Sequence, residues 1–120
     1  MIRIKRLFKS FTYALKGLKK VFAEEQNFQI QTTAAILVVG LGIYFRIRAI
    51  EWCVLIITAS LVLLMELVNS AIERTTDILK PRIHDYVKEI KDIMAAAVFL
   101  SSISSVIIGL IIFLPHILNL

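Results

Sequence analysis

The 120-residue sequence has few cysteines, prolines and glycines: one, two and four, respectively. A single cysteine cannot form an internal disulfide, so a disulfide framework is excluded. The four glycines form neither a Walker A motif nor a GxGxxG motif, which excludes a glycine-rich phosphate loop. Residues 26–45 and 93–120 contain no Asp, Glu, Lys or Arg. Uncharged stretches of this length indicate a membrane environment rather than a water-soluble domain.

Apolar residues fill those stretches and define the class of protein. They make up 58% of the chain, and the mean hydropathy is +0.82. A membrane-spanning helix needs about 20 largely apolar residues, and residues 28–47, 50–70 and 93–115 meet this requirement. We therefore predict an all-α membrane protein with three transmembrane helices in a single domain, residues 1–120.

Lysine and arginine residues are distributed unevenly around the predicted spans. Seven precede the first span, two (Arg46 and Arg48) lie around the turn between the first and second, and five lie between the second and third. By the positive-inside rule, the N-terminus and the second loop face the cytoplasm. The net charge of +5 could attract nucleic acid, but the basic residues flank apolar spans, where anionic lipid headgroups are nearer. We expect no nucleic-acid partner.

Residues 1–24 have the pattern of an amphipathic surface helix. Within residues 2–22, large apolar side chains recur at helical spacing, whereas lysines occupy another face. A helix of this kind lies in the membrane interface, with its lysines directed toward lipid headgroups. Residues 23–33, which follow, are rich in acids, amides and hydroxyls, and we expect these groups to face the helix bundle rather than lipid.

Four polar residues form a row on the second span. Glu66, Asn69, Glu73 and Asp77 are three, four and four residues apart, which places them on one helix face. The row extends about 16 Å along the helix axis, from the inner leaflet to the cytoplasm. A carboxylate inside the membrane is costly, so Glu66 is a candidate for function.

The helical pattern of the second span continues beyond the membrane to about residue 79. Pro81 cannot continue a helix interior, so we expect the helix to end before it. Residues 82–92 are then expected to form a short cytoplasmic link into the third span. No internal repeat divides the chain into further domains.

Three interpretations of the polar row are open. In the first, Glu66 and Asn69 only form hydrogen bonds with neighbouring helices and stabilise the structure. In the second, the row relays protons or binds a transported cation. In the third, it takes part in chemistry on a lipid headgroup at the membrane surface.

Charged residues on the other segments favour the third interpretation. Glu25 lies at the inner boundary of the first span, as Glu73 does in the second. Two carboxylates at one depth suit Mg²⁺, which binds few carboxylates together with phosphate oxygens. Lys91 and Asp92 enter the third span at this depth, and Lys91 supplies a cation for phosphate. With Glu66 at the depth of a lipid hydroxyl, the pattern indicates phosphoryl transfer from a cytoplasmic nucleotide to a membrane alcohol.

Several strings resemble the motifs of a known enzyme family. ELVNSAIE (residues 66–73), EEQNF (24–28), YALKGL (13–18) and the KD pair (91–92) resemble the signature of the bacterial integral-membrane diacylglycerol kinases, a family that includes undecaprenol kinases. The resemblance covers nearly the whole chain. It implies a lipid kinase of the bacterial inner membrane, built as a homotrimer of three-span subunits. Each subunit would carry an N-terminal surface helix, and the active sites would be shared between subunits.

The resemblance also implies roles for individual residues. Glu66 matches the catalytic base that takes the proton from the lipid hydroxyl, and Asn69 would position Glu66 and its substrate. Glu25 and Glu73 match the acids that hold Mg²⁺ on ATP. The residues expected near ATP are Arg6, Tyr13, Lys16, Glu25, Glu73, Asp77, His84, Lys91 and Asp92, with a solvated loop residue as the alternative for His84.

Two further strings bear on the lipid. The undecaprenol kinase branch is resembled by two strings: NF (residues 27–28), which follows Glu24 and Glu25 in EEQNF, and GIYFRIRAIEW (residues 42–52). The expected acceptor is therefore undecaprenol, which would give undecaprenyl phosphate. Diacylglycerol, which would give phosphatidate, is the alternative acceptor. A proton- or cation-translocating protein, or a structural membrane protein, is the alternative from a different class.

Overall fold

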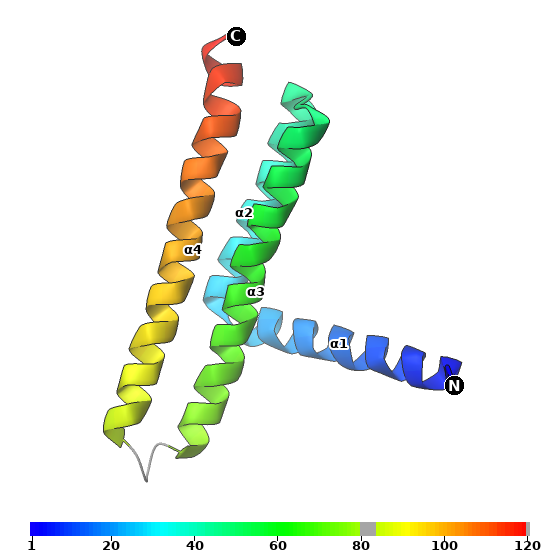
Figure 1. Cartoon of the computed structure of the whole chain (residues 1–120), viewed down its shortest axis with the longest axis vertical. Coiled ribbons are helices and arrows are strands. Elements are labelled where there is room, and N and C mark those ends of the chain that lie inside the picture. Colours follow the sequence, from blue (N-terminus) through cyan, green and yellow to red (C-terminus); the bar gives the residue numbers. More distant parts are fainter. Residues whose placement is uncertain (80–83, 120) are drawn as a thin grey trace.

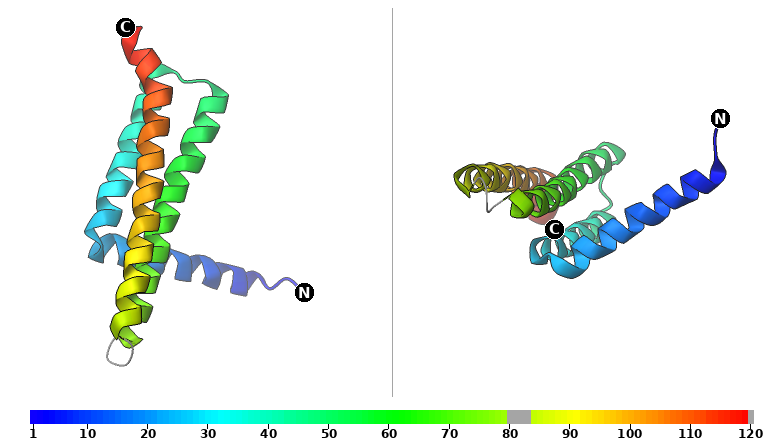
Figure 2. Two further views of the ribbon diagram at one scale, coloured as in Figure 1. Left: turned by 60° about the vertical axis from the view of Figure 1, so that its left-hand side comes forward. Right: turned by 90° about the horizontal axis from the view of Figure 1, so that it is seen from below.

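The protein is all-helical, as predicted. The computed structural model describes residues 1–79 and 84–119, and for His84 the backbone alone. Its helices are α1 (Ile4–Glu24), α2 (Gln26–Phe45), α3 (Ala49–Leu79) and α4 (His84–Leu118). Helices α2, α3 and α4 run side by side, whereas α1 leaves the bundle at a steep angle and carries the N-terminus away from it (Figures 1 and 2).

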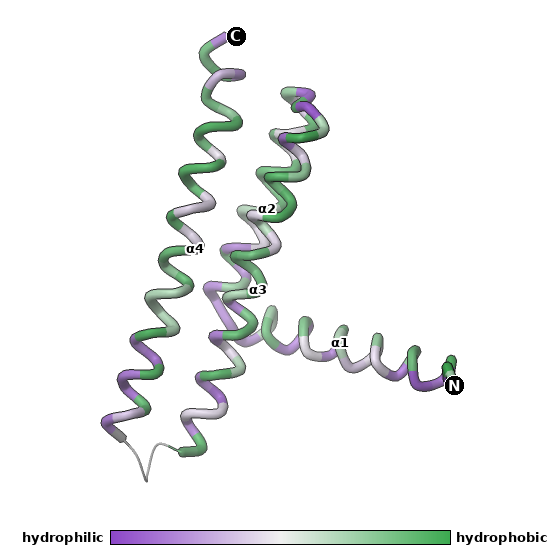
Figure 3. The backbone as a smooth tube through the Cα atoms, viewed as in Figure 1, coloured by the Kyte–Doolittle hydropathy of each residue, from purple (hydrophilic) through white to green (hydrophobic). Residues whose placement is uncertain are grey.

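Three of these helices are long and apolar enough to cross a membrane: Gln26–Phe45, Ala49–Leu79 and Asp85–Leu118. The prediction of three candidate spans is therefore confirmed. Polar residues gather where α1 meets the bundle and at the start of α4, whereas the opposite part of α4 is largely apolar (Figure 3). Many apolar side chains point outward in the single chain, including Ile36, Ile57 and Leu100. A lipid environment accounts for this exposure.

α2 ends two residues before the predicted end of the first span, and the turn to α3 begins at Arg46. Arg46 adopts a left-handed conformation (φ 51°, ψ 55°), and its backbone N–H donates to the Ile43 carbonyl at 3.3 Å. The Ile47 N–H donates to the Gly42 carbonyl at 3.2 Å. A left-handed residue with two returning hydrogen bonds is a common helix C-cap, so α2 ends at Phe45 rather than at residue 47.

Gly42 allows α2 and α3 to meet closely beside this turn. A Cβ atom at Gly42 would lie 2.8 Å from Cη2 of Trp52 and 3.2 Å from Cδ1 of Ile47. At Gly40, by contrast, a Cβ atom would meet nothing within 4 Å. The indole of Trp52 thus occupies the space left by the missing side chain. Close packing at this end continues into a buried cluster, which consists of Ile47, Leu55, Ile112 and Phe113.

The connection to the third span is more helical than expected. α4 begins at His84, so residues 84–92 of the predicted link are helical and continue directly into the third span. Two contacts with the bundle explain the extra helical turns: Val87 is 2% exposed, and Lys91 Nζ lies 2.6 Å from Asp77 Oδ1 on α3. α3 ends at Leu79, and the expected stop at Pro81 lies outside the described residues.

Candidate active site

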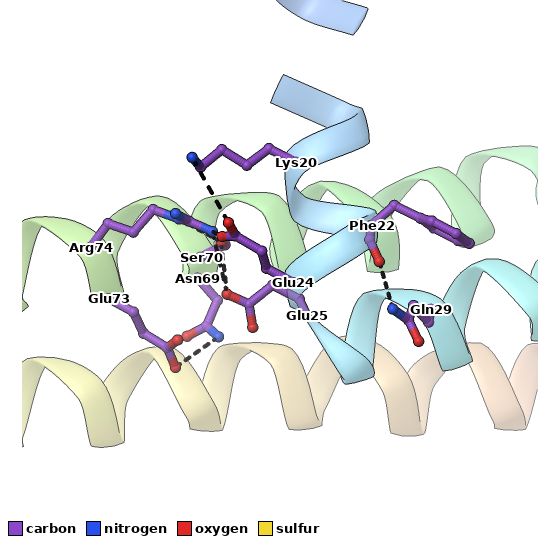
Figure 4. Close-up of polar contacts among 9 residues, drawn as sticks. All are labelled: Lys20, Phe22, Glu24, Glu25, Gln29, Asn69, Ser70, Glu73 and Arg74. Atoms are coloured by element: carbon purple, nitrogen blue, oxygen red, sulfur yellow. Dashed lines mark hydrogen bonds and ion pairs between the residues drawn. The ribbon is translucent and has the colours of Figure 1, made fainter. Parts of the chain in front are cut away.

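The junction of α1 and α2 places two carboxylates beside α3 (Figure 4). Glu24 ends α1, and Glu25 separates α1 from α2 with extended backbone angles of φ −108° and ψ 111°. The Glu25 N–H donates to the Val21 carbonyl at 2.8 Å, and the Glu25 carbonyl accepts from the Gln29 N–H at 3.2 Å. The Glu25 side chain forms no cap with α2, so its carboxylate is available to α3.

Ser70 and Arg74 of α3 bind these two carboxylates. Ser70 Oγ donates to Glu25 Oε1 at 3.2 Å, and Ser70 is 2% exposed. Arg74 Nη2 donates to Glu24 Oε2 at 2.7 Å and lies 3.8 Å from Glu25 Oε1. Arg74 Nε also donates to Ser70 Oγ at 3.4 Å. The hydrogen bond from Arg74 holds the pKa of the Glu24 carboxyl below its usual value.

The polar row on α3 continues this site toward the membrane. Asn69 Nδ2 donates to Glu73 Oε1 at 3.4 Å, which confirms that these two residues share a face, as their spacing predicts. Glu66 lies seven residues before Glu73, about 10 Å deeper along α3, and is 5% exposed. The described part of the chain provides no hydrogen bond to the Glu66 carboxyl. Its neighbouring charges are the carboxylates of Glu25 and Glu73.

Carboxylates from two segments therefore converge at one end of the bundle. Glu25 and Glu73 supply hard oxygen donors of the kind that Mg²⁺ prefers. Within residues 1–79 and 84–119, no group of three or more His, Cys, Asp or Glu side chains forms a metal site. Two carboxylates suit a metal ion that arrives with further oxygen ligands from a nucleotide and from water.

The outer end of the row is paired with α4. Lys91 Nζ lies 2.6 Å from Asp77 Oδ1 across the two helices. Lys91 is partly buried, whereas Asp92 is exposed. Lys91 therefore lies beside the outer end of the row, at Asp77.

Comparison with known proteins assigns the chain to a family. The family described as "Prokaryotic diacylglycerol kinase" matches residues 12–113. The chain belongs to this family. It is 38% identical over 112 residues to a protein named undecaprenol kinase from Bacillus subtilis (strain 168), covering 93% of this chain and 91% of that protein.

Two proteins named diacylglycerol kinase are also similar. The protein from Synechocystis sp. is 36% identical over 115 residues, which covers 95% of this chain and 66% of that protein. The protein from Escherichia coli (strain K12) is 32% identical over 111 residues, which covers 92% and 91% of the two chains. The predicted family is thus confirmed, and with it the prediction of a lipid kinase, which acts on a lipid and ATP.

The structure does not bring three of the predicted ATP-binding residues to the acids of the same kinase chain. Arg6, Tyr13 and Lys16 lie on α1 and are exposed. At 1.5 Å per residue they precede Glu25 by about 28, 18 and 14 Å along the helix. Lys16 Nζ lies 6.0 Å from the centre of the Tyr13 ring, so these two of the three residues lie close to each other on α1. The side chain of His84 lies outside the described residues.

Sequence reasoning missed three residues of the site: Glu24, Ser70 and Arg74. The signal for them was present. Ser70 and Arg74 are four residues apart, which places them side by side on a helix, and Arg74 immediately follows the Glu73 of the kinase motif. What the sequence could not supply was the sharp turn at Glu25, which directs the two acids at the junction of α1 and α2 toward this pair.

Proposed function

We propose that this kinase transfers the γ-phosphoryl group of ATP to undecaprenol and forms undecaprenyl phosphate. The observation that carries the proposal is the position of Glu66, a carboxylate that is 5% exposed and lies about 10 Å along α3 from Glu73. This spacing suits a base beside a lipid hydroxyl and acids beside a nucleotide. The similarity to the Bacillus subtilis undecaprenol kinase supports the choice of acceptor.

In the proposed reaction, the oxygen of the lipid hydroxyl attacks the γ-phosphorus of ATP, and Glu66 accepts the proton that this hydroxyl loses. The bond between the γ-phosphorus and the bridging oxygen breaks, and ADP leaves with that oxygen. The surroundings of Glu66 favour this role, because the described residues leave its carboxyl free of hydrogen bonds and able to receive the proton. Asn69, bound to Glu73, positions the reacting groups between the base and the nucleotide.

Glu25 and Glu73 are the proposed ligands of Mg²⁺ on ATP. When bound, Mg²⁺ neutralises part of the negative charge on the β- and γ-phosphates. Lys91 and Asp77 form an ion pair on the nucleotide side of these acids. With Asp92 and His84, they are proposed to contact ATP.

The proposed assembly is a homotrimer in the bacterial inner membrane, with the N-terminus in the cytoplasm. The reach of α1 supports a shared active site, because Arg6, Tyr13 and Lys16 are exposed and lie about 14 Å or more along α1 from Glu25 of their own chain. Reconstitution of two inactive variants together, Glu66→Gln and Arg6→Ala, tests this sharing. Recovery of activity in mixed oligomers is expected, whereas no recovery would restrict each site to one subunit.

The test of the proposed function is a competition assay with purified protein in micelles. Undecaprenol and diacylglycerol are supplied together with labelled ATP and Mg²⁺, and the label is measured in each lipid. Preferential labelling of undecaprenol is expected. Preferential labelling of diacylglycerol would support the alternative acceptor, for which the Escherichia coli and Synechocystis relatives are precedents. Label in neither lipid, with ion flux in liposomes, would support a transporter instead.

A further inference from the structure

Arg74 is the basic residue at the centre of the contacts around Glu25 (Figure 4). We propose that Arg74 is a positioning residue: together with Ser70, it fixes the Glu25 carboxylate in the orientation that receives the metal-bound nucleotide. The inference rests on the proposed role of Glu25 as a metal ligand and adds a determinant of that site.

The hydrogen bonds around Ser70 define this role. A serine hydroxyl has one hydrogen to donate, and Ser70 directs it to Glu25 Oε1 at 3.2 Å. The Ser70 oxygen in turn accepts from Arg74 Nε at 3.4 Å. Arg74 thus orients the hydroxyl that orients the carboxylate. Ser70 is 2% exposed, so its hydroxyl is shielded from water, whereas the Arg74 and Glu25 side chains are 43% and 33% exposed.

The other end of the guanidinium is also held. Arg74 Nη2 donates to Glu24 Oε2 at 2.7 Å, so the planar group is fixed by α1 as well as by Ser70. An arginine fork suits this arrangement, since it donates from separate nitrogens in one plane. A lysine could replace the charge but not both contacts.

Charge gives Arg74 a second role at the same place. The carboxylates of Glu24, Glu25 and Glu73 all lie within electrostatic reach of the Arg74 guanidinium, whose positive charge offsets part of their mutual repulsion. Arg74 Nη2, 3.8 Å from Glu25 Oε1, is the one Lys, Arg or His nitrogen of the described residues within 4 Å of that carboxylate. Lys20 Nζ is 3.8 Å from Glu24 Oε1, and among the described residues it forms an ion pair with no acid but Glu24.

A simpler reading is that Arg74 only anchors α1 by its ion pair with Glu24. The two readings differ in what Glu24→Ala should do. If anchoring is the whole role, Glu24→Ala and Arg74→Ala have equal effects, and the double variant resembles either one. If Arg74 positions Glu25, then Arg74→Ala impairs MgATP use more than Glu24→Ala does. Adding Arg74→Ala to the Glu24→Ala variant should then cause a further loss.

Steady-state kinetics with saturating lipid separate these readings. We expect Arg74→Ala to raise KM for MgATP on the order of tenfold, with a smaller change in kcat. Arg74→Lys should recover part of the loss, and Glu24→Ala should raise KM less than Arg74→Ala. Equal KM values for Arg74→Ala, Glu24→Ala and the double variant would overturn the proposal.

A binding measurement without lipid tests the same point independently of turnover. Binding of a fluorescent ATP analogue is measured with Mg²⁺ and with EDTA. Arg74→Ala should reduce the gain in affinity that Mg²⁺ provides and leave the affinity in EDTA unchanged. An equal loss in both conditions would mean that Arg74 contacts the phosphates directly, and would overturn the proposed route through Glu25.

The opposite end of α3 offers a matched control. Arg48 forms an ion pair with Glu51, with Nε 3.3 Å from Oε1. Arg48→Ala therefore removes an arginine from an ion pair near the other end of the same helix, and KM for MgATP should stay at the wild-type value. A similar rise in KM for Arg48→Ala would make the effect of Arg74 nonspecific and overturn the proposal. If the wild-type protein phosphorylates neither lipid, the proposed function fails, and the binding measurement still tests Arg74.

Discussion

Ser70 Oγ donates a hydrogen bond to Glu25 Oε1 at 3.2 Å, joining two residues that lie 45 positions apart. This contact brings the acidic junction of α1 and α2 onto the polar row of α3. It thereby makes one site from two strings, EEQNF and ELVNSAIE, that are separate in the sequence. The consequences can be tested residue by residue.

The first prediction concerns the two proposed metal ligands. Glu25→Gln and Glu73→Gln should each raise KM for MgATP by on the order of tenfold or more, because an amide is a poorer ligand for Mg²⁺ than a carboxylate. Steady-state kinetics over a range of free Mg²⁺ provide the measurement. Glu89→Gln, which removes an exposed acid of α4, is the matched control. Unchanged Mg²⁺ dependence in both site variants would refute the assignment.

A second prediction concerns the packing of α2 against α3. Gly42→Ala should destabilise the protein by about 1–3 kcal/mol, because the added methyl group would overlap the Trp52 ring. Gly40→Ala is the control, since its Cβ meets nothing within 4 Å. Thermal unfolding in detergent, followed by circular dichroism, gives the comparison. Equal Tm values for the two variants would contradict the packing described here.

The third prediction follows from the ion pair at the junction of α1 and α2. Arg74 lowers the pKa of Glu24 in the folded state. Since this pKa is depressed, the stabilisation is present above the unfolded value of about 4.3 and is lost as the pH falls through the folded pKa. Carbon-13 NMR titration of Glu24 measures the folded value directly. It should rise toward the usual value in Arg74→Ala and rise less in Lys20→Ala. A larger rise in the Glu24 pKa in Lys20→Ala than in Arg74→Ala would mean that Lys20, and not Arg74, is the main cause of the lowered pKa.

The helices could be predicted from the sequence because apolar length and charge distribution are local properties. Residues 28–47, 50–70 and 93–115 all fall almost entirely within observed helices. The boundaries were less predictable, because tertiary contacts decide them. The first turns of α4 are stabilised by the burial of Val87 and by the ion pair of Lys91 with Asp77. This segment is too short for its pattern of apolar residues to predict that it is helical.

The site was predictable where it follows one helix and not where it depends on a turn. Asn69 and Glu73 are four residues apart on α3, so their contact follows from helix geometry. The contact of Arg74 with Glu24 spans 50 residues and depends on the direction of the chain at Glu25. Arg6 lies about 28 Å along α1 from Glu25 of its own chain, so its proposed contact with ATP depends on the proposed trimer and could not be derived from local spacing.

The central claim is that Glu66 is the base that activates a lipid hydroxyl. The most direct test compares wild type and Glu66→Gln in vesicles that contain undecaprenol, with single-turnover phosphorylation and MgATP binding measured on the same samples. Glu51→Gln, a substitution near the other end of α3, serves as the control and should retain activity. We expect Glu66→Gln to bind MgATP with near wild-type affinity and to transfer phosphate at least about a hundredfold more slowly. Phosphate transfer at the wild-type rate by Glu66→Gln would rule out Glu66 as the base.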